Sequence, residues 1–440
     1  MNKARRIRLL DFRSTPMRSF HLSWIAFFLC FFGWFGLAPL MAIVRDELHL
    51  TKPQIGNTIM ASVAITIIGR IFIGWLCDRT GPRKAYTGLL LFGSLPVIFI
   101  GLAHNYETFL LFRLAIGIIG ASFVITQYHT SIMFAPEIVG AANATAAGWG
   151  NLGGGATQIV MPLLFGMFVS AGVSRFWSWR LSMAVIGLAM IVAGVLYYNL
   201  TQDAPDGNFD KLRNNSQSFA KSGVNRAFIA SFKDVRVWSL AALYGACFGV
   251  ELTIDNIAAL YFHDSFHLNL QTAGIVAGSF GMMNLFARAL GGFTSDWLAA
   301  RFGIRGRITL LGATIFLEGI ALAAFSRITV LPAAVSLLLL TGLFVKMSNG
   351  ATYAIVPFVR KEGLGAVSGI VGAGGNFAAM CYAFLFRSPQ LSWSTALLIL
   401  GIIVTIASIF ISPLRRLAEP RPREGVKKSA ADHLLTRVVL

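Results

Sequence analysis

Two arginines stand inside long apolar stretches of this sequence, and the residues that follow them repeat. Arg70 lies in "GRIFIGWLCDRTGPRK" and Arg288 in "ARALGGFTSDWLAARFG". Each arginine is followed by a glycine at i+4 and an aspartate at i+8, and no acidic residue lies within seven positions of Arg70. A guanidinium fork makes two parallel N–H···O bonds to a small planar oxyanion. The pair is therefore suited to holding such an anion.

The overall composition shows what kind of chain carries these arginines. Of the 440 residues, 56% are hydrophobic and only 13% are charged. Soluble globular proteins have about a quarter charged residues, so this composition indicates a membrane protein. The basic start, "MNKARRIRLLDFRSTPMRSFHLSW", has no small-residue cleavage site of the kind that ends a signal peptide. The four cysteines, scattered through apolar stretches, are predicted to be buried small residues.

Apolar stretches of about 20 residues predict membrane-spanning helices. There are twelve, which makes the expected fold an all-α membrane protein. The expected spans are 21–44, 54–77, 85–103, 107–135, 138–171, 178–200, 237–262, 270–295, 308–326, 330–357, 364–387 and 391–412.

The long polar segment at the centre divides these spans into two sets of six. Because the Arg70 segment and its partner around Arg288 lie about half a chain apart, the halves are predicted to be a duplication. That is the organisation of the major facilitator fold, which holds its substrate between the halves. The expected units are a tail 1–20, a six-helix bundle 21–200, a linker 201–236, a second six-helix bundle 237–413 and a tail 414–440.

The distribution of positive charge predicts the orientation. The net charge is +18, and most of the 37 Lys and Arg lie in the two tails, the central linker and alternate short loops. This is the positive-inside pattern, which predicts cytoplasmic termini and linker in a multi-pass protein of the cell membrane. Membrane orientation accounts for the basic charge, so nucleic acid is not an expected partner.

Helix geometry predicts the depth of the two arginines. Each lies eight residues before an aspartate at the cytoplasmic end, or ~12 Å along a helix. The hydrocarbon half-thickness is about 15 Å, so both arginines are expected near the bilayer centre. Burying two unpaired cations there is costly, and a visiting anion would offset the cost for both. The residues themselves therefore predict an anion carrier.

Two glycine-rich stretches give the family resemblance. The fifth span contains "AAGWGNLGGGATQIVMP" and the eleventh "SGIVGAGGNFAAMCYAF". These resemble the paired signatures of the nitrate/nitrite porter family, a branch of the major facilitators. Further similarity in "MRSFHLSW", "ASFVITQYHTSIMF" and "GVELTIDNIAALYFHDSFHL" extends the resemblance over roughly residues 17–413. It is closer to the high-affinity nitrate transporters of plants, algae and cyanobacteria than to bacterial respiratory exchangers.

The resemblance implies a set of site residues. According to the resemblance, Arg70 and Arg288 bind the anion from two sides, and Asn151 donates a hydrogen bond to it. Three aromatic residues are expected to enclose the ion: Phe123, Tyr244 and Phe248. The signature glycines let helices approach closely and slide as the halves alternate, or only pack tightly. They are Gly148, Gly150, Gly153, Gly154, Gly372, Gly374 and Gly375.

Two acids are candidates for proton coupling. Tyr244, Phe248, Glu251 and Asp255 are spaced i, i+4, i+7 and i+11, so they share one face of the seventh span. A carboxyl near the midplane could take up protons together with the anion. The tenth span departs from the plant-type pattern by carrying Lys346, which is a candidate ion-pair partner that would withdraw Glu251 from proton traffic.

The predicted function is proton-coupled uptake of nitrate, with nitrite as a second substrate, by a non-enzymatic transporter. Alternatives are a nitrate/nitrite exchanger, a carrier of another small inorganic anion, and a nitrate sensor that moves nothing. No nucleotide-binding loop, metal-ligand spacing or nucleophile constellation is present, so no cofactor and no metal are expected. The expected partners are nitrate, protons and the lipid bilayer, and the sequence does not decide whether an accessory membrane protein is needed.

Overall fold

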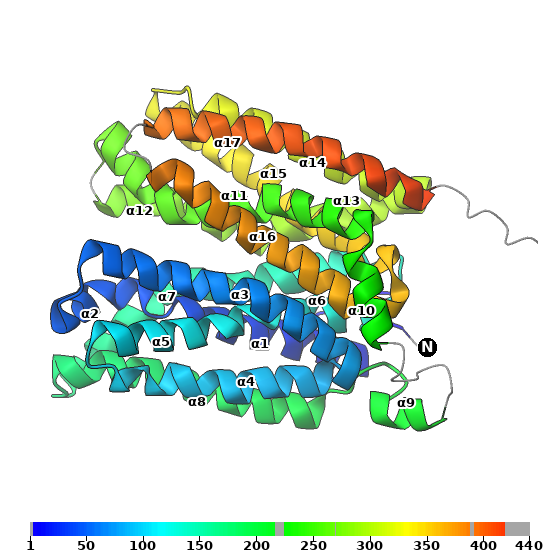
Figure 1. Cartoon of the computed structure of the whole chain (residues 1–440), viewed down its shortest axis with the longest axis horizontal. Helices are drawn as coiled ribbons and strands as arrows, with labels where there is room; N and C mark the ends of the chain where they lie inside the picture. The colour runs from blue at the N-terminus through cyan, green and yellow to red at the C-terminus, as the bar shows by residue number, and fades with distance from the viewer. Residues whose placement is uncertain (1–2, 216–223, 269, 388–390, 419–440) are drawn as a thin grey trace, which may run out of the picture.

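The structure is a computed structural model, and it describes residues 3–215, 224–268, 270–387 and 391–418. It consists of two helical bundles lying side by side, with their helices running along the long axis (Figure 1). The first bundle contains α1 (Thr15–Phe35), η1 (Ala38–Leu40), α2 (Met41–Leu48), α3 (Lys52–Thr80), α4 (Pro82–Phe99), η2 (Ile100–Leu102), α5 (Tyr106–Gly117), η3 (Ile118–Ala121), α6 (Ser122–Met133), α7 (Val139–Ser170) and α8 (Arg175–Leu200).

A linker with two short helices, α9 (Phe209–Asn215) and α10 (Val224–Phe232), leads to the second bundle. That bundle contains α11 (Val235–Phe266), α12 (Leu270–Met282), η6 (Met283–Leu285), α13 (Ala287–Phe302), α14 (Ile304–Phe325), α15 (Leu331–Val359), η7 (Lys361–Gly363), α16 (Leu364–Arg387), α17 (Trp393–Ala407) and η8 (Ser408–Ala418).

The all-α fold with two six-helix halves is confirmed, and each expected span corresponds to helix. Ten segments of the described chain are long and apolar enough to cross a membrane, and the other two expected spans are α7 and the pair α12–α13. The first, fourth and eighth spans are each interrupted by a short 3₁₀ turn. Helix α1 begins at Thr15, earlier than the expected start at 21. Most of the tail expected at 414–440 lies outside the described residues.

Two helices of the first bundle, α3 and α5, begin with side chains that cap their first turns. Thr51 and Gln54 form a capping box at the start of α3, with the Thr51 backbone N–H donating to Gln54 Oε1 at 2.9 Å. Asn105 caps α5 by accepting from the Thr108 backbone N–H at 2.9 Å. These side chains satisfy backbone groups that the first turn of a helix leaves unpaired.

The two halves are tied together at one end by the repeated aspartates. Asp78, at the end of α3, accepts hydrogen bonds from the backbone N–H groups of residues 365 and 366 at 3.1 and 3.0 Å. Asp296, on α13, accepts from residues 140 and 141 at 3.2 and 2.6 Å. In both cases a carboxylate of one half caps the N-terminal turn of a helix in the other, where it also complements the helix dipole. This end of the molecule is therefore closed.

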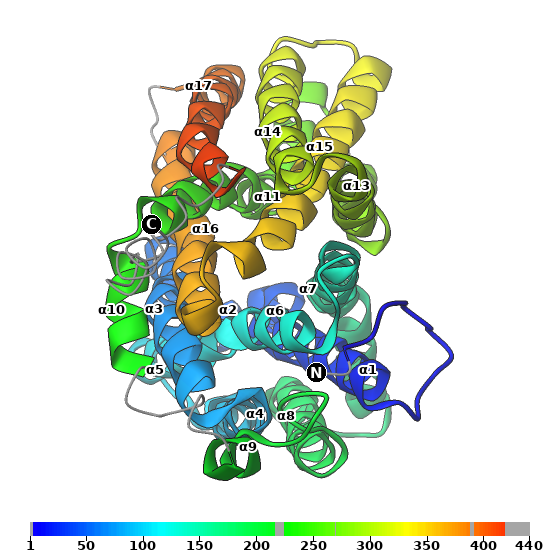
Figure 2. The ribbon, with the colours of Figure 1, turned by 90° about the vertical axis from the view of Figure 1, so that its right-hand side faces the viewer.

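Glycines allow the halves to meet so closely beside these aspartates. A Cβ on Gly74 of α3 would overlap the carbonyl oxygen of Gly365 on α16. A Cβ on Gly292 of α13 would overlap the carbonyl oxygen of Gly140 on α7. Viewed from this end, α3 lies beside α16, and α7 lies near α13 (Figure 2). The duplicated sequence thus places backbone against backbone at two equivalent crossings.

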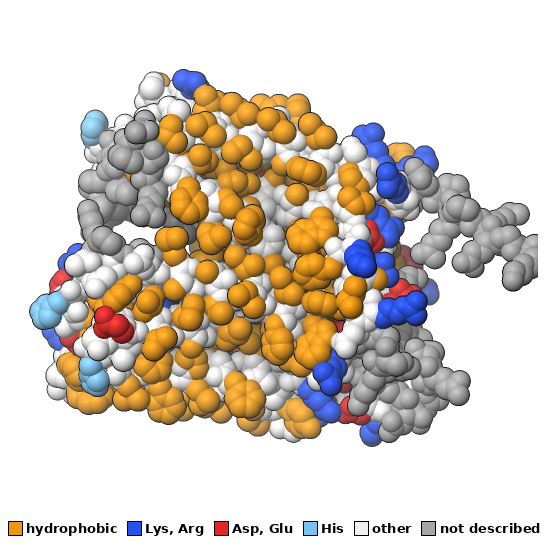
Figure 3. Space-filling model, viewed as in Figure 1, with side chains coloured by type: hydrophobic (Ala, Val, Ile, Leu, Met, Phe, Trp, Pro, Cys, Tyr) orange, Lys and Arg blue, Asp and Glu red, His pale blue; other side chains and the backbone are white. Residues whose placement is uncertain are grey.

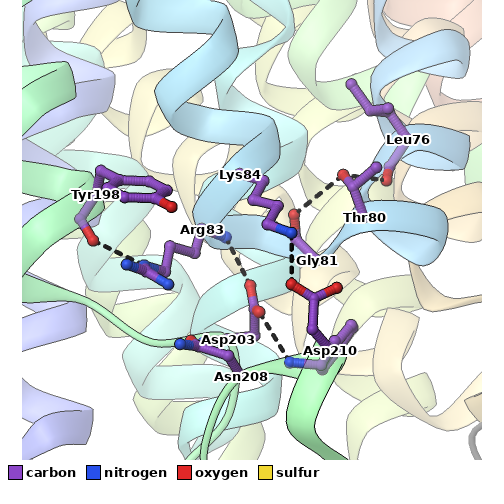
Figure 4. Close-up of polar contacts among 10 residues, drawn as sticks. Leu76, Thr80, Gly81, Arg83, Lys84, Tyr198, Asp203, Asn208 and Asp210 are labelled. Atoms are coloured by element: carbon purple, nitrogen blue, oxygen red, sulfur yellow. Dashed lines mark hydrogen bonds and ion pairs between the residues drawn. The ribbon is translucent and has the colours of Figure 1, made fainter. Parts of the chain in front are cut away.

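The turn between α3 and α4 is anchored to the linker (Figure 4). Gly81 in this turn has a φ of +87°, and a Cβ there would overlap the Asp203 carboxylate. Asp203 accepts from the Arg83 backbone N–H at 2.9 Å, while Lys84 forms an ion pair with Asp210. Burial raises the pKa of the Asp203 carboxyl, although the backbone hydrogen bonds that it accepts from Arg83 and Phe209 act in the opposite direction. The linker is therefore docked on the closed end.

Side-chain type varies along the long axis of the molecule. On the face shown in Figure 3, apolar side chains form a broad band across the middle, and Lys and Arg gather at the end that carries α10 and the N-terminus. This is the end closed by Asp78 and Asp296 (the basic end below). Of the cysteines, Cys30, Cys77 and Cys247 are buried as predicted. The prediction is wrong for Cys381, which is exposed because its face of α16 is not covered by another helix.

Candidate functional site

Arg70 and Arg288 are both fully buried between the two halves, with 0% and 1% of their surface exposed. Arg70, on α3, donates from NH1 to the Gly372 carbonyl of α16 at 2.6 Å and from Nε to the Gly120 carbonyl of η3 at 3.4 Å. Its NH2 group has no hydrogen-bond partner among the described residues. A guanidinium held on one side and unpaired on the other is ready to bind an acceptor.

Arg288 is the second residue of α13, just after the 3₁₀ turn that interrupts the eighth span. Its NH2 group lies 3.3 Å from Glu251 Oε2 of α11. Its Nε and NH1 groups have no hydrogen-bond partner within the described part of the chain. Both predicted arginines thus present buried, unsatisfied N–H donors, which native proteins rarely leave without a function.

Aromatic rings connect the two guanidinium groups. Phe123 of α6 and Phe248 of α11 stack with ring centroids 6.3 Å apart. The Arg70 Cζ lies 5.2 Å from both ring centroids, and the Arg288 Cζ lies 5.9 Å from Phe123 and 5.7 Å from Phe248. Both arginines therefore face the same two rings, one contributed by each half. Such cation–π contacts stabilise buried charge without using its hydrogen-bond donors.

Two further predicted residues add unsatisfied donors. Tyr244 stacks on Phe248 with centroids 5.0 Å apart, and its hydroxyl has no hydrogen-bond partner among the described residues. Asn151 of α7 is buried, and its Nδ2 is also without a partner in the described chain. Tyr244 is thus in contact with the ring pair, whereas Asn151 forms no hydrogen bond from its Nδ2 to any described residue. Neutral donors of this kind suit an anion whose oxygen atoms accept several hydrogen bonds.

Glu251 is held by four donors. Lys346 of α15 lies 2.7 Å from Oε1, and Arg288 lies 3.3 Å from Oε2. The side-chain amides of Asn284 and Asn349 donate to Oε1 at 2.8 Å and to Oε2 at 2.6 Å. The candidate ion pair between Lys346 and Glu251 is therefore present. Each of these contacts favours the ionised carboxylate over the acid.

Asp255 has a different environment, although it lies only one turn along the same face of α11. Its side chain is exposed, in contrast to the buried Glu251. It has no hydrogen bond or ion pair to another described residue. Because α11 starts at the basic end, Asp255 lies on the far side of Glu251 from that end.

The signature glycines divide into two groups. Gly148 contacts η6, and Gly372 contacts the Arg70 side chain, so these two glycines lie between the halves. The later glycines face the first helix of their own half: Gly150, Gly153 and Gly154 face α1, and Gly374 and Gly375 face α11. A Cβ on most of these residues would overlap a neighbouring ring or carbonyl, with Gly154 the most tolerant.

Four residues were missed as candidates for the site itself. Tyr353 packs edge-on against Phe123 and Tyr244 at 4.7 and 5.0 Å. It is seven residues after Lys346, and Asn349 lies between them on the same helix face, so periodicity could have indicated both. Asn284 precedes Arg288 by one turn. Asn376, one turn after Gly372 in the eleventh-span signature, is fully buried with neither amide atom paired in the described chain.

The site residues form a cationic, aromatic-lined cluster with no nucleophile and base in contact. Within the described residues, no group of three or more His, Cys, Asp or Glu side chains is placed to hold a metal ion. The arrangement can bind a small anion by charge-assisted hydrogen bonds from both halves at once. An anion bound in this way would contact both halves, so its binding would depend on how the halves are positioned relative to each other.

Sequence comparisons identify the family and the relatives of this chain. Residues 23–302 match the model of the Major Facilitator Superfamily. The chain is 39% identical to the high affinity nitrate transporter 2.5 of Arabidopsis thaliana over 93% of this chain and 81% of that protein. It is 36% identical to nitrate transporter 2.2 of Chlamydomonas reinhardtii, covering 97% and 85%. It is 29% identical to the nitrate/nitrite transporter NrtP of Nostoc punctiforme, covering 85% and 87%.

Solved structures share the fold at low sequence identity. The major facilitator transporter FucP in its outward conformation superposes with a TM-score of 0.68 at 18% identity, covering 92% of this chain and all of that one. The proton:xylose symporter XylE gives a TM-score of 0.66 at 14% identity, covering 90% and 95%. These similarities concern the arrangement of the helices.

Proposed function

This chain belongs to the nitrate transporters of the major facilitator superfamily, and on that premise we propose that it carries nitrate across the membrane by alternating access. The observation that carries the proposal is the pair of buried arginines, one from each half, with unsatisfied N–H donors beside the same two aromatic rings. Nitrate is planar and singly charged, and its oxygen atoms accept in-plane hydrogen bonds. Nitrite has the same properties and is proposed as a second substrate.

The charge inventory of the site supports an anionic ligand. Arg70, Arg288 and Lys346 are cations, and Glu251 is the only carboxylate recorded in contact with them among the described residues. The empty site therefore has excess positive charge in a water-excluded environment, where an unpaired charge is costly. A bound nitrate removes part of that excess. Tyr244, Asn151 and Asn376 are proposed as its neutral donors.

The transport cycle is proposed to break and re-form the contacts that close the basic end, namely the glycine crossings and the aspartate caps. With that end closed, nitrate enters from the opposite end and contacts both arginines. Separation of Asp78 and Asp296 from their partner helices would then open the basic end. The bundles 21–200 and 237–413 are proposed as the two moving units, joined by the linker 201–236.

The basic end is proposed to face the cytoplasm of a cell-membrane transporter, with both termini and the linker on that side. The concentration of Lys and Arg there supports this orientation by the positive-inside rule. Replacing the exposed residues Asn105 and Arg226 by cysteine, one at a time, tests it. An impermeant thiol reagent should label the variant at Asn105 in intact cells and leave the one at Arg226 unlabelled, and the reverse result would overturn the orientation.

Proton coupling is proposed to use Asp255, with Glu251 as a permanent carboxylate. Four donors hold Glu251 ionised, so it is poorly placed to gain and lose a proton during each cycle. The Asp255 side chain is exposed and lies one turn away, near Lys346, Glu251 and Arg288, which are the charged groups facing it. Entry of more than one proton with each nitrate would carry positive charge inward. Each such charge gains about 2.3 kcal/mol per 100 mV of inside-negative potential.

The deciding experiment is uptake of labelled nitrate into proteoliposomes whose pH gradient and membrane potential are set independently. Accumulation driven by an inward proton gradient supports the proposal. Accumulation only against nitrite loaded inside would identify an exchanger, and nitrate binding without any flux would identify a sensor. Competition by nitrite and chloride measures selectivity among small anions. Activity of the purified chain alone would show that no accessory membrane protein is required.

A further inference from the structure

A cavity of about 780 Å³ lies on the second half, between the first turns of α14 and the 3₁₀ segment η8. It is separate from the nitrate site and shares no residue with it. Ile308 and Ile411 form part of its apolar wall and are almost fully buried. Phe316 and Ile409 line it at the surface, with 46% and 67% of their area exposed. Apolar side chains this exposed are expected where a helix faces lipid.

The polar rim of the cavity is cationic. Arg305, in the first turn of α14, and Arg415, on η8, both line it, and both are exposed. Neither forms an ion pair with another described residue. The hydroxyl-bearing Thr309 and Ser412 line the same cavity, and none of the lining residues is acidic. Two unpaired guanidinium groups and two hydroxyls form a donor set suited to a phosphate group.

The position along the bundle matches the headgroup level of a membrane. Helix α14 starts, and η8 ends, at the basic end. Trp238 at the start of α11 and Trp297 near the end of α13 are both about half exposed at the same end. Exposed tryptophans of this kind mark the interface between hydrocarbon and headgroups. The arginines of the cavity therefore lie at headgroup depth, while Phe316 lies deeper along α14.

We propose that this cavity binds an anionic phospholipid of the surrounding leaflet. The phosphate and acidic headgroup would lie between Arg305 and Arg415, and an acyl chain would extend along Phe316 and Ile409. Basic pockets between membrane helices at the cytoplasmic side are suited to acidic headgroups. Because the cavity lies between α14 and η8, a lipid bound in it would contact both segments and hold the end of the last span against the bundle. The proposal does not depend on which anion the protein transports.

The test uses the purified full-length protein and short-chain phosphatidylglycerol, with phosphatidylcholine as the neutral comparison. Lipid retention is measured by native mass spectrometry, and thermal stability is measured in detergent with each lipid. Phosphatidylglycerol should be retained more than phosphatidylcholine and should raise the Tm of the wild type. Arg305→Gln and Arg415→Gln should each weaken retention by roughly fivefold, since one arginine near an anionic headgroup contributes about that factor.

Two further variants separate this site from general surface charge. Arg416→Gln removes the same charge one residue further along η8, at a position that lines a different cavity, and should retain the lipid as the wild type does. Ala313→Leu fills the proposed site without changing charge and should reduce retention. Equal losses in Arg415→Gln and Arg416→Gln, or retention unchanged in all variants, would overturn the proposal. So would an equal stabilisation by inorganic phosphate, because a free anion would then suffice.

Discussion

Lys346 and Glu251 form a buried ion pair, with 2.7 Å between Nζ and Oε1, beside Arg288, the arginine of the second half in the proposed anion site. The pair joins α15 to α11, so it lies within one half and can persist while the halves move. It leaves Arg70 and Arg288 as the cations that are proposed to bind an entering anion. Lys346 is therefore an internal counter-charge for Glu251.

The first prediction follows from this pair. Glu251→Gln should leave Lys346 and part of Arg288 without a counter-charge, lowering stability by about 3–5 kcal/mol, as expected when one partner of a buried pair is removed. Thermal unfolding of the purified variant measures the loss. The double variant Glu251→Gln with Lys346→Gln should recover most of it. A fully stable single variant would mean that the pair contributes little and that Glu251 is free to exchange its proton.

Asp255 carries the second prediction. Asp255→Asn mimics the protonated acid, so nitrate binding and nitrate exchange should persist while accumulation driven by a pH gradient is lost. Proteoliposome uptake at equal and unequal pH separates the two activities. Asp255→Glu, which keeps a titratable carboxyl, should retain part of the coupling. Undiminished proton-driven accumulation in Asp255→Asn would exclude this residue as the proton site.

The guanidinium geometry is the basis of the third prediction. Arg70→Lys and Arg288→Lys keep the charge and lose the planar fork, so each should weaken nitrate binding by roughly 10- to 100-fold, the worth of a charge-assisted hydrogen bond. Isothermal titration of protein that remains monodisperse measures the change. Arg113→Lys is the matched control, because Arg113 is also buried in a span but bonds to the Trp34 carbonyl. Wild-type affinity in either clamp variant would contradict the assignment.

The fourth prediction concerns closure of the basic end. A Cβ on Gly74 would overlap the Gly365 carbonyl, so Gly74→Ala should hold the halves apart there and favour the state open to the basic end. Gly155→Ala is a suitable control, since nothing lies within 4 Å of its Cβ position. Thiol labelling of a cysteine introduced near Asp78 should rise several-fold in Gly74→Ala only. Equal labelling in both variants would show that this crossing does not control access.

Much of the fold followed from local properties of the sequence. Hydrophobic length marks a membrane helix wherever it occurs, so the twelve spans could be recognised without knowledge of their neighbours. The duplication of arginine, glycine and aspartate around Arg70 and Arg288 indicated two equivalent halves, and helix rise alone placed both arginines at depth. What could not be predicted was the rotation of each helix about its axis. Cys381 illustrates this limit, because its exposure depends on whether another helix covers that face of α16.

The amino-acid sequence by itself determined the membrane class, the twofold organisation, the buried arginines and the family resemblance, because each depends on residue type, order or spacing. The tertiary structure decided which side chains form hydrogen bonds, ion pairs and ring contacts with one another. Glu251 and Asp255 share a helix face, yet α15 brings Lys346 and Asn349 to the first and leaves the second open. The rings of Tyr353 and Phe123 meet only because α15 of one half and α6 of the other both reach the site. Such contacts join residues far apart in the chain, so they depend on how the helices pack, which no local pattern records.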